Sequence, residues 1–392
     1  MLLFEEALQI VMDSVRACGV EQVGIDLALN RILAQDVISD MDIPPFNKSA
    51  MDGYACRKED ILNELSIVET IPAAYVPQKS IHKNECAKIM TGAIVPPGAD
   101  CVIKIEDTEK ISANAIRFVG KTTAKINICY QAEDIKTGDL VLSKGEIIRP
   151  QHIAVLATVG ITNPIVACRP KVGIIATGSE LIEPSEKPPV SKIRNSNSYQ
   201  LFAQAAAMGA LPCNYGIAID TNEAIDDKIK KAIAENDVIL ISGGVSVGDL
   251  DLVPEVLKEN GIKLLFEKIG VQPGQPTTFG ISNDIVCFGL AGNPVSTFVL
   301  FEIMVKPFLY KMMGHNFIPD KIAVPLGKTI TRTHTERKSI VPVAFTNNEK
   351  VMPIEYHGTA HINSFCRADG FISIPVGVKE LKESTIVNVR QF

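Results

Sequence analysis

A pair of glycines, two serines and an aspartate surround the end of an apolar run in the segment 237–249, DVILISGGVSVGD. The β-branched run Val238–Ile241 predicts a fully buried strand. Gly243 and Gly244 would let the backbone adopt positive φ and approach a ligand closely. The helix expected after them would offer free N–H groups to an anion. These residue types in this order are typical of a site for a phosphate-bearing or similarly anionic ligand.

Two further strand ends carry residues of the same kind. The segment 172–180 ends in Gly178 and Glu180, and the segment 286–296 ends in an Asn-Pro-Val-Ser turn that begins at Asn293. Ligands of open α/β sheets bind in the crevice outside the carboxyl ends of the strands. We therefore expect these three loops to meet in one crevice.

The elements that must position these loops alternate between strand and helix from Lys171 to Gly314. The expected elements are 171–176, 198–208, 215–219, 222–235, 237–241, 252–259, 262–269 and 285–289. Such alternation is the sequence form of a mostly parallel sheet with helices on both faces. Before it, 4–17 and 151–160 predict helices and 55–147 predicts short strands; after it, 322–390 predicts a small β domain.

The segment 44–55, PPFNKSAMDGYA, has neither a helical nor a strand period. A long surface turn is one interpretation of this composition. The other is a loop that presents Lys48, Ser49 and Asp52 to a ligand. Loops of this length are often functional, so we favour the second interpretation.

Composition excludes several classes of protein. The 392 residues carry a net charge of −6 without a basic stripe, which argues against nucleic-acid binding. Nine cysteines without a CxxC pair argue against a disulfide framework. The N-terminal segment has no basic region of a signal peptide, and the apolar segment 294–313 contains Glu302, Lys306, Pro307 and Lys311, so it predicts a buried or subunit-interface helix. We expect a reduced, cytoplasmic protein of several domains without a membrane partner.

Seven motifs span the chain: PPFNKSAMDGYA (44–55), IMTGAIVPPGAD (89–100), AEDIKTGD (132–139), ATGSEL (176–181), SGGVSVGD (242–249), PGQPTTFG (273–280) and GNPVS (292–296). They occur in the order found in the molybdopterin molybdenumtransferase family, which includes the C-terminal domain of gephyrin. The segment 357–371, HGTAHINSFCRADGF, also resembles the last domain of that family. The resemblance covers essentially the whole chain.

The resemblance implies the last step of molybdenum cofactor synthesis. Adenylylated molybdopterin and molybdate bind as substrates, Mg²⁺-dependent hydrolysis releases AMP, and molybdenum is placed on the dithiolene sulfurs. Hydrolysis of a phosphoanhydride needs a metal, a positioned nucleophile and stabilisation of developing negative charge. The resemblance also implies transient contact with a molybdopterin adenylyltransferase, which would supply the adenylylated pterin.

The residues that match the family's motifs fall into three groups. Catalytic roles would belong to Asp52, Thr91, Asp134, Glu180, Asp220, Asp251 and Lys268. Mg²⁺, which prefers oxygen ligands, would bind Glu180, Asp220 and Asp251. The pterin substrate would bind Gly178, Ser242, Gly243, Gly244, Ser246, Asn293, Pro294 and Thr359. Each carboxylate also has a structural alternative; Asp220, for example, stands where it could simply begin a helix.

The resemblance further implies an α/β multidomain fold and an elongated homodimer with a composite active site. That site would lie between the second domain of one chain and the third and fourth domains of the other. The expected domains are an elongated mixed α/β N-terminal domain (1–47 and 138–168), an inserted β-rich domain (48–137), a three-layer α/β domain (169–314) and a small β-barrel-like C-terminal domain (315–392).

Several positions depart from the family's pattern. Gln272 and Gln275 stand where lysines are usual, and Cys129 stands where arginine is common. Asn47, Ala132 and Ala291 replace an aspartate, a glycine and a proline. Each lost charge-assisted hydrogen bond would cost roughly 1.5–3 kcal/mol if nothing replaced it. A preference for tungstate, or a weakly active molybdopterin-binding scaffold, is therefore an alternative function.

Two other motif interpretations stay open. Residues 244–248 match GxSxG, the nucleophile elbow of serine hydrolases, with Ser246 as the nucleophile. A triad would then need a late histidine, which only the region after the α/β segment supplies. His357 and His361 have the spacing of a zinc pair, but a turn is favoured because no glutamate lies between them.

Overall fold

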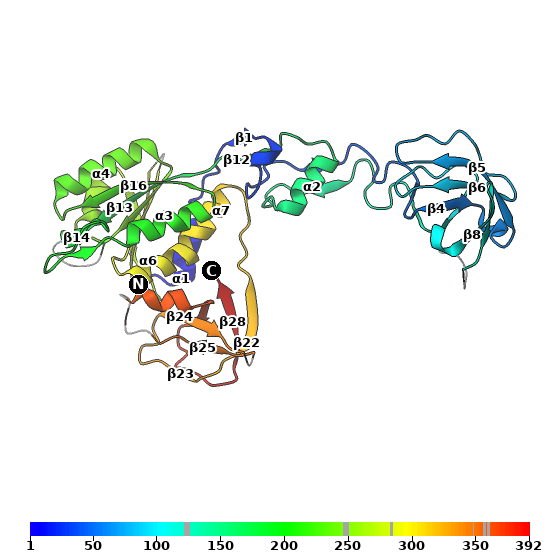
Figure 1. Ribbon diagram of the computed structural model, residues 1–392. Coiled ribbons are helices and arrows are strands. Elements are labelled where there is room, and N and C mark those ends of the chain that lie inside the picture. The colour runs from blue at the N-terminus through cyan, green and yellow to red at the C-terminus, as the bar shows by residue number, and fades with distance from the viewer. Residues whose placement is uncertain (121–125, 246–250, 283–284, 348, 356–357, 359–360) are drawn as a thin grey trace.

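The computed structural model describes residues 1–392 with the exception of 121–125, 246–250, 283–284, 348, 356–357 and 359–360. The molecule is elongated: an α/β unit and a strand-rich unit lie at opposite ends, and a second β unit packs beside the α/β unit (Figure 1). The multidomain α/β class predicted from the sequence is confirmed.

The α/β unit is built on a six-stranded sheet. Its strands, in order across the sheet, are β16 (Leu211–Ala218), β13 (Lys171–Thr177), β17 (Val238–Ser242), β21 (Val286–Leu290), β20 (Pro276–Ile281) and β18 (Lys263–Lys268). The first four are parallel, whereas β20 is antiparallel to both of its neighbours. The sequence analysis named no strand at β20. Because β18 is antiparallel to β20, it runs in the same direction as the four parallel strands and ends at the same edge of the sheet.

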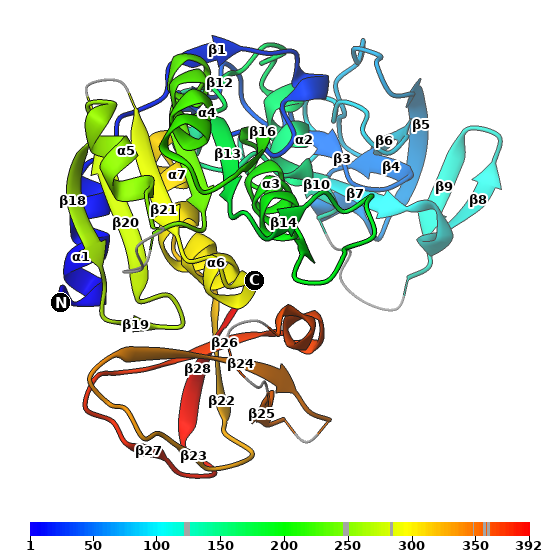
Figure 2. The same ribbon diagram turned by 90° about the vertical axis from the view of Figure 1, so that its left-hand side faces the viewer.

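Helices cover both faces of this sheet (Figure 2). The helices are α1 (Phe4–Asp13), α3 (Asn197–Ala207), α6 (Pro294–Leu300) and α7 (Lys306–Met312) on one face, and α4 (Asn222–Glu235) and α5 (Val253–Glu259) on the other. Val238 and Leu240 of β17 pack with the first group, and Ile239 and Ile241 pack with the second. Side chains alternate between the faces of a strand, so β17 is buried on both sides, as its apolar run predicts.

The apolar segment 294–313 forms α6 and α7, joined by the single π-helical turn η4 (Phe301–Val305). Pro307 has no N–H to donate, and a π-turn before it accommodates the interrupted hydrogen-bond ladder. Glu302 accepts hydrogen bonds from Lys306 and Gln204, both at 2.9 Å, so its buried charge is paired. The segment is a core helix. Within the described residues, no helix is long and apolar enough to cross a membrane.

A narrow connecting region joins the two ends of the molecule (Figure 1). It contains β1 (Val20–Gln22) paired with β12 (Ile165–Ala167), β2 (Val37–Ile38) paired with β11 (Leu140–Leu142), η1 (Ile25–Leu27) and α2 (Pro150–Thr158). The helix predicted at 4–17 ends earlier, at Asp13. Past that point the Cys18 N–H bonds to the Met312 carbonyl at 2.7 Å, so the chain turns onto α7 instead of continuing the helix.

The strand-rich unit has a second six-stranded sheet. Its strands, in order, are β7 (Cys101–Lys104), β4 (Gly53–Cys56), β6 (Glu85–Ile89), β5 (Glu64–Ile71), β9 (Ala115–Phe118) and β8 (Thr108–Ser112). The short elements around it are β3 (Lys48–Ser49) paired with β10 (Ile128–Cys129), η2 (Lys58–Asp60) and η3 (Ile105–Asp107). Separate apolar clusters lie on its two faces, one with Tyr54 and the other with Ala55.

The C-terminal β unit follows the strand path β19 (Val271–Gln272), β24 (Lys338–Phe345), β26 (Gly370–Ile374), β28 (Ile386–Gln391) and β22 (Lys321–Pro325). Its other elements are β25 (Val351–Pro353), the pair β23 (Ile330–Thr331) and β27 (Glu380–Leu381), and η5 (Ile362–Arg367). Leu326, directly after β22, bridges Val351 of β25, and β25 pairs with β24, so the chain after β22 returns to the other side of the sheet. Strand β19 belongs in sequence to the α/β segment but pairs in parallel with β24, so the two units share a sheet.

Candidate functional site

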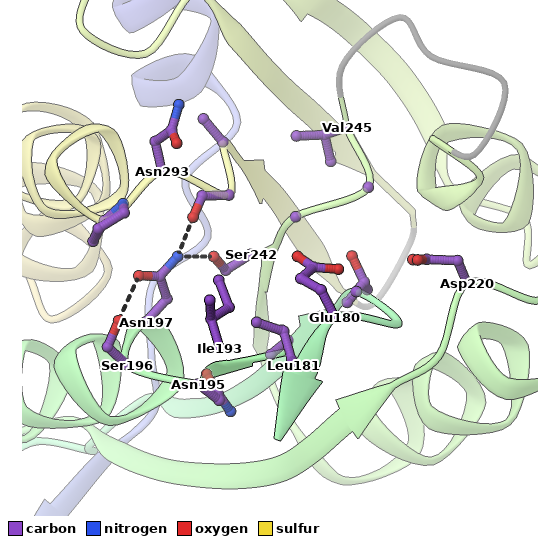
Figure 3. Close-up of a pocket in the computed structure, with 18 of the residues that line it drawn as sticks. Glu180, Leu181, Ile193, Asn195, Ser196, Asn197, Asp220, Ser242, Val245 and Asn293 are labelled. Carbon is purple, nitrogen blue, oxygen red and sulfur yellow. Dashed lines mark hydrogen bonds between the residues drawn. The ribbon is translucent and has the colours of Figure 1, made fainter. Parts of the chain in front are cut away.

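A cavity of about 710 Å³ opens at the carboxyl edge of the α/β sheet. The loops after β13, β17 and β21 contribute to its wall, as the three strand-end segments predict. It contains nine of the predicted site residues: Gly178, Glu180, Asp220, Ser242, Gly243, Gly244, Asp251, Asn293 and Pro294. Figure 3 shows this space, with Ser242 and Asn197 on one side and Glu180 and Asp220 on another.

The turn after β17 accepts only glycine. Gly243 and Gly244 have φ of 98° and 65°, in the left-handed region. A Cβ on Gly243 would lie 2.4 Å from the carbonyl oxygen of Thr177 on the neighbouring strand. A Cβ on Gly244 would lie 2.7 Å from the Thr177 hydroxyl. The double glycine thus brings the backbone of this turn against β13 and leaves the cavity open above it.

Glu180 is held close to the turn after β13. Gly178 has φ of 150°, and a Cβ there would lie 2.6 Å from a carboxylate oxygen of Glu180. The lack of a side chain at Gly178 therefore leaves room for the Glu180 carboxylate. This explains the Gly-Ser-Glu order that follows the strand.

Asp220 has a defined partner in the same turn. Its carboxylate accepts a hydrogen bond from the Ser179 N–H at 2.8 Å, and its own N–H donates to the Ser179 hydroxyl at 3.0 Å. The helix α4 is capped instead by Thr221, whose hydroxyl accepts from the Ala224 N–H at 3.3 Å. Asp220 is thus not the cap of the helix, and its side chain is fixed at the cavity wall.

The three predicted metal ligands, Glu180, Asp220 and Asp251, all line this cavity. Across the described residues, no group of three or more His, Cys, Asp or Glu side chains is placed to hold a metal ion by itself. A metal at this wall would therefore need oxygen ligands from water or substrate as well. Mg²⁺ is usually bound in that way.

Asn197 is a cavity-lining residue that the sequence analysis did not name. Its side-chain amide donates to the Ser242 hydroxyl at 2.8 Å and to the Gly292 carbonyl at 2.7 Å (Figure 3). It also lies 3.4 Å from the hydroxyl of Thr297 in α6. One amide at the start of α3 therefore joins the ends of β17 and β21. The available signal was the Asn-Ser cluster 195–198, which is also typical of an ordinary helix start.

Asp52 and Thr91 lie together, but away from the cavity. The Asp52 carboxylate accepts hydrogen bonds at 2.7 Å from both the N–H and the hydroxyl of Thr91. These two bonds lower the pKa of Asp52 below its ordinary value. Both side chains are exposed, and they belong to the strand-rich unit at the other end of the molecule (Figure 1). Asp134, also exposed, bonds through its N–H to the Ile43 carbonyl at 3.0 Å.

Lys268 does not line the cavity either. It is exposed at the end of β18, where its register partner is Pro276, a residue of the cavity wall. Next to Pro276, Gln275 accepts a hydrogen bond from Arg337 at 2.9 Å. The C-terminal β unit thus supplies a guanidinium beside one of the positions where a lysine was expected.

Four residues of the sequence analysis lie outside the described part of the chain. They are Ser246, Asp249, His357 and Thr359. The hydrolase interpretation of Ser246, the His357–His361 pair and the binding role of Thr359 therefore stay predictions.

Comparison with known families divides the chain into three matched regions. Residues 2–160 match the MoeA N-terminal region (domain I and II), and residues 173–311 match a probable molybdopterin binding domain. Residues 324–392 match the MoeA C-terminal region (domain IV). The three matches follow one another and together cover nearly the whole chain.

Curated relatives and solved structures agree with this division. A molybdopterin molybdenumtransferase of Staphylococcus epidermidis is 36% identical over 382 residues, covering 94% of this chain and 90% of the relative. The corresponding protein of Staphylococcus aureus is 32% identical, with 98% and 94% covered. The crystal structure of a molybdopterin biosynthesis moeA protein from Pyrococcus horikoshii OT3 matches with a TM-score of 0.87, 31% identity and full coverage of both chains. The chain belongs to the molybdopterin molybdenumtransferase (MoeA) family.

Proposed function

We propose that this protein is a molybdopterin molybdenumtransferase. It inserts molybdenum from molybdate into adenylylated molybdopterin and releases AMP in a Mg²⁺-dependent step. The observation that carries this proposal is the cavity in which two glycine turns and three carboxylates meet, in a chain whose relatives at 32–36% identity bear that name.

The glycine turns would bind the phosphate-bearing substrate. The Gly243 N–H already donates to the Leu290 carbonyl at 3.0 Å, so the Gly244 N–H is the one that would approach the phosphate oxygens at this turn. Asn197 holds Ser242 and Gly292 in place on either side of the substrate. Because these groups are fixed before binding, little ordering cost is left for the substrate to offset.

The carboxylate wall fits Mg²⁺. Glu180, Asp220 and Asp251 offer hard oxygen donors, which Mg²⁺ prefers, and the substrate phosphates and water would complete its coordination. When bound, Mg²⁺ would neutralise charge on the phosphoanhydride. Asp220 is oriented by Ser179, and the Glu180 carboxylate lies beside Gly178. Asp251 also lines the cavity, and its charge would position the attacking water.

Asp52, Thr91 and Asp134 would complete the site from a second chain. Within one chain none of the three lines the cavity, and Asp52 and Thr91 belong to the strand-rich unit at the other end of the molecule (Figure 1). An isologous dimer of an elongated subunit brings opposite ends of two chains together and forms two equivalent sites. The domains proposed for that dimer are 1–47 with 138–168, 48–137, 169–314 and 315–392. An adenylyltransferase would deliver the substrate by transient contact.

The test is incubation of the purified protein with adenylylated molybdopterin, Mg²⁺ and molybdate, followed by assay of AMP and of active cofactor. We expect AMP only when both the divalent metal and the oxyanion are present. AMP release that continues in EDTA would remove the metal from the mechanism. Replacing molybdate by tungstate tests the oxyanion preference, because Gln272 and Gln275 stand where the family usually has lysines.

A further inference from the structure

Three cysteines lie side by side across neighbouring strands of the strand-rich unit. Cys56 ends β4, and its register partners are Cys101, which begins β7, and Cys86 on β6. All three side chains are fully buried, in the cluster that also contains Tyr54. The three residues are 30 and 15 positions apart along the chain, so no short motif reveals the row.

Cys56 and Cys101 form the close pair of this row. Their sulfur atoms are 3.5 Å apart, a distance at which one thiol can donate a weak hydrogen bond to the other. This bond lowers the pKa of the Cys101 thiol and raises the pKa of the Cys56 thiol. Cys101 also begins β7, the edge strand of the sheet, so we assign it as the thiol that reacts first, in its thiolate form.

We propose that Cys56 and Cys101 are a redox-active dithiol that hydrogen peroxide converts to an intramolecular disulfide. The Cys101 thiolate attacks one peroxide oxygen, the O–O bond breaks, and Cys101 becomes a sulfenic acid while hydroxide leaves and takes up a proton to form water. The Cys56 sulfur then attacks the Cys101 sulfur, and a second water leaves. In total, two thiols and one peroxide give one disulfide and two waters.

The strand register suits the product. Directly paired residues of antiparallel strands have Cα atoms about 4.5–5.5 Å apart. Disulfides accept Cα separations of about 4.4–6.8 Å. The bond therefore forms without a change of register. Both cysteines stand at strand ends, and β7 lies at the edge of the sheet, where local opening exposes side chains most easily. Hydrogen peroxide is small enough to enter through such an opening, whereas an oxidant of the size of glutathione disulfide would have to open the core.

The same two strands carry Asp52. Gly53 of β4 pairs with Lys104 of β7, and the Ile105 N–H bonds to the Asp52 carbonyl at 3.1 Å. A covalent link at the Cys56 end therefore ties together the strand pair whose other end holds the backbone of Asp52. In the oxidised form the disulfide would keep the Cys56 end of the β4–β7 pair closed.

The experiment exposes the full-length protein to hydrogen peroxide, removes the peroxide with catalase, and alkylates the remaining thiols after denaturation. We expect the intact mass to show two fewer alkyl groups than the untreated protein, and digestion to give one cross-linked peptide pair that contains Cys56 and Cys101. Dithiothreitol should restore both alkylation sites. The oxidised protein should also melt at a higher temperature than the reduced protein, because the link closes a 45-residue separation.

Variants provide the matched controls. Cys56→Ser and Cys101→Ser should each abolish the cross-link, whereas Cys86→Ser and Cys287→Ser, which also replace buried cysteines, should leave it intact. The peptide map of the unchanged protein decides the question if a variant does not fold. A Cys56–Cys86 cross-link, over-oxidation of Cys101 without a link, or three unreacted thiols would each overturn the proposal.

Discussion

The cavity of the α/β unit and the Asp52 surface of the strand-rich unit are organised in opposite ways. The cavity is lined by three strand-end loops, two of which contain glycine turns, and by the amide of Asn197. Asp52 and Thr91 form an equally definite hydrogen-bonded pair, but they lie exposed on the surface. The first region is a cavity with walls on several sides, whereas the second has hydrogen-bonded polar groups on an open surface.

This difference suggests separate roles for the cavity and the Asp52 surface, which the experiments below would test. A pocket fixed by backbone turns suits binding, since its groups need no rearrangement. Water screens the electrostatic interaction between an exposed carboxylate and a charged substrate. This interaction becomes strong only when another surface excludes the water. We therefore expect changes in the cavity to act within one chain, and changes at Asp52 to act across a subunit boundary.

The largest effect should come from the carboxylate wall. Asp251→Ala should lower turnover by at least ~10²-fold, as removal of a group that positions charge in the transition state does. Asp227→Ala, an exposed carboxylate of α4, is the control and should keep full turnover. Circular dichroism checks that both variants are folded. An unchanged rate for Asp251→Ala would remove this residue from the site.

The division between chains is tested by mixing two inactive variants. Asp52→Ala and Asp251→Ala are combined under conditions in which subunits exchange, and native mass spectrometry confirms the mixed dimer. In a mixed dimer one site receives both substitutions and the other receives neither, so activity should return to ~25% of the unchanged protein after random exchange. A site built within one chain gives no recovery, because each site then keeps one substitution.

The position of the cavity wall after β17 depends on its glycine turn. Gly243→Ala should lower the free energy of unfolding by roughly 1–3 kcal/mol from its left-handed backbone alone, with a further loss from the contact with Thr177. Gly261→Ala is the matched control: Gly261 also has positive φ, at 76°, but a Cβ there meets no atom within 4 Å. Chemical denaturation of both variants separates backbone strain from steric contact. Equal losses would show that the contact is unimportant.

A smaller effect is expected at Asn197. Asn197→Ala removes the amide that joins Ser242 and Gly292, and loss of neutral hydrogen bonds should weaken substrate binding roughly 2- to 10-fold. Asn236→Ala removes an amide with comparable bonds, to Tyr215 and Ala232, away from the cavity. The KM for the pterin should rise in the first variant alone. A fall in turnover at unchanged KM would assign Asn197 to chemistry instead of binding.

The smallest effect concerns the pH dependence of the exposed pair. Thr91→Val removes one of the two bonds that lower the pKa of Asp52, so this pKa should move up toward its ordinary value. If turnover needs ionised Asp52, activity should then be lost at a higher pH as the solution is acidified. The pH–rate profile on the acid side measures the shift, with Thr108→Val as a surface control. If Thr91→Val loses activity at the same acidic pH as the unchanged protein, turnover does not depend on the ionised carboxylate of Asp52.

The sequence predicted the α/β sheet well because buried strands and glycine turns leave local patterns. The run Val238–Ile241 and the two following glycines identified both a strand and the cavity wall. Strand β20 was missed because it begins with Pro276 and contains Gly280, which are typical of loops, and because its direction depends on pairing between distant segments. Asn197 was missed for a similar reason: its partners are 45 and 95 residues away.

The sharing of a sheet between the α/β unit and the C-terminal β unit bears on how the chain can be divided. Strand β19 bonds to β24, Gly270 bonds to the Leu2 carbonyl at 2.8 Å, and Lys338 forms an ion pair with Glu5 at 2.7 Å. A chain shortened at residue 314 would keep most of the cavity wall but lose the partner of β19 and leave an open sheet edge beside the first helix. Unpaired edges invite association with other chains. The two units should therefore melt in one cooperative transition, and the C-terminal region is part of the scaffold of the cavity domain and not a detachable appendage.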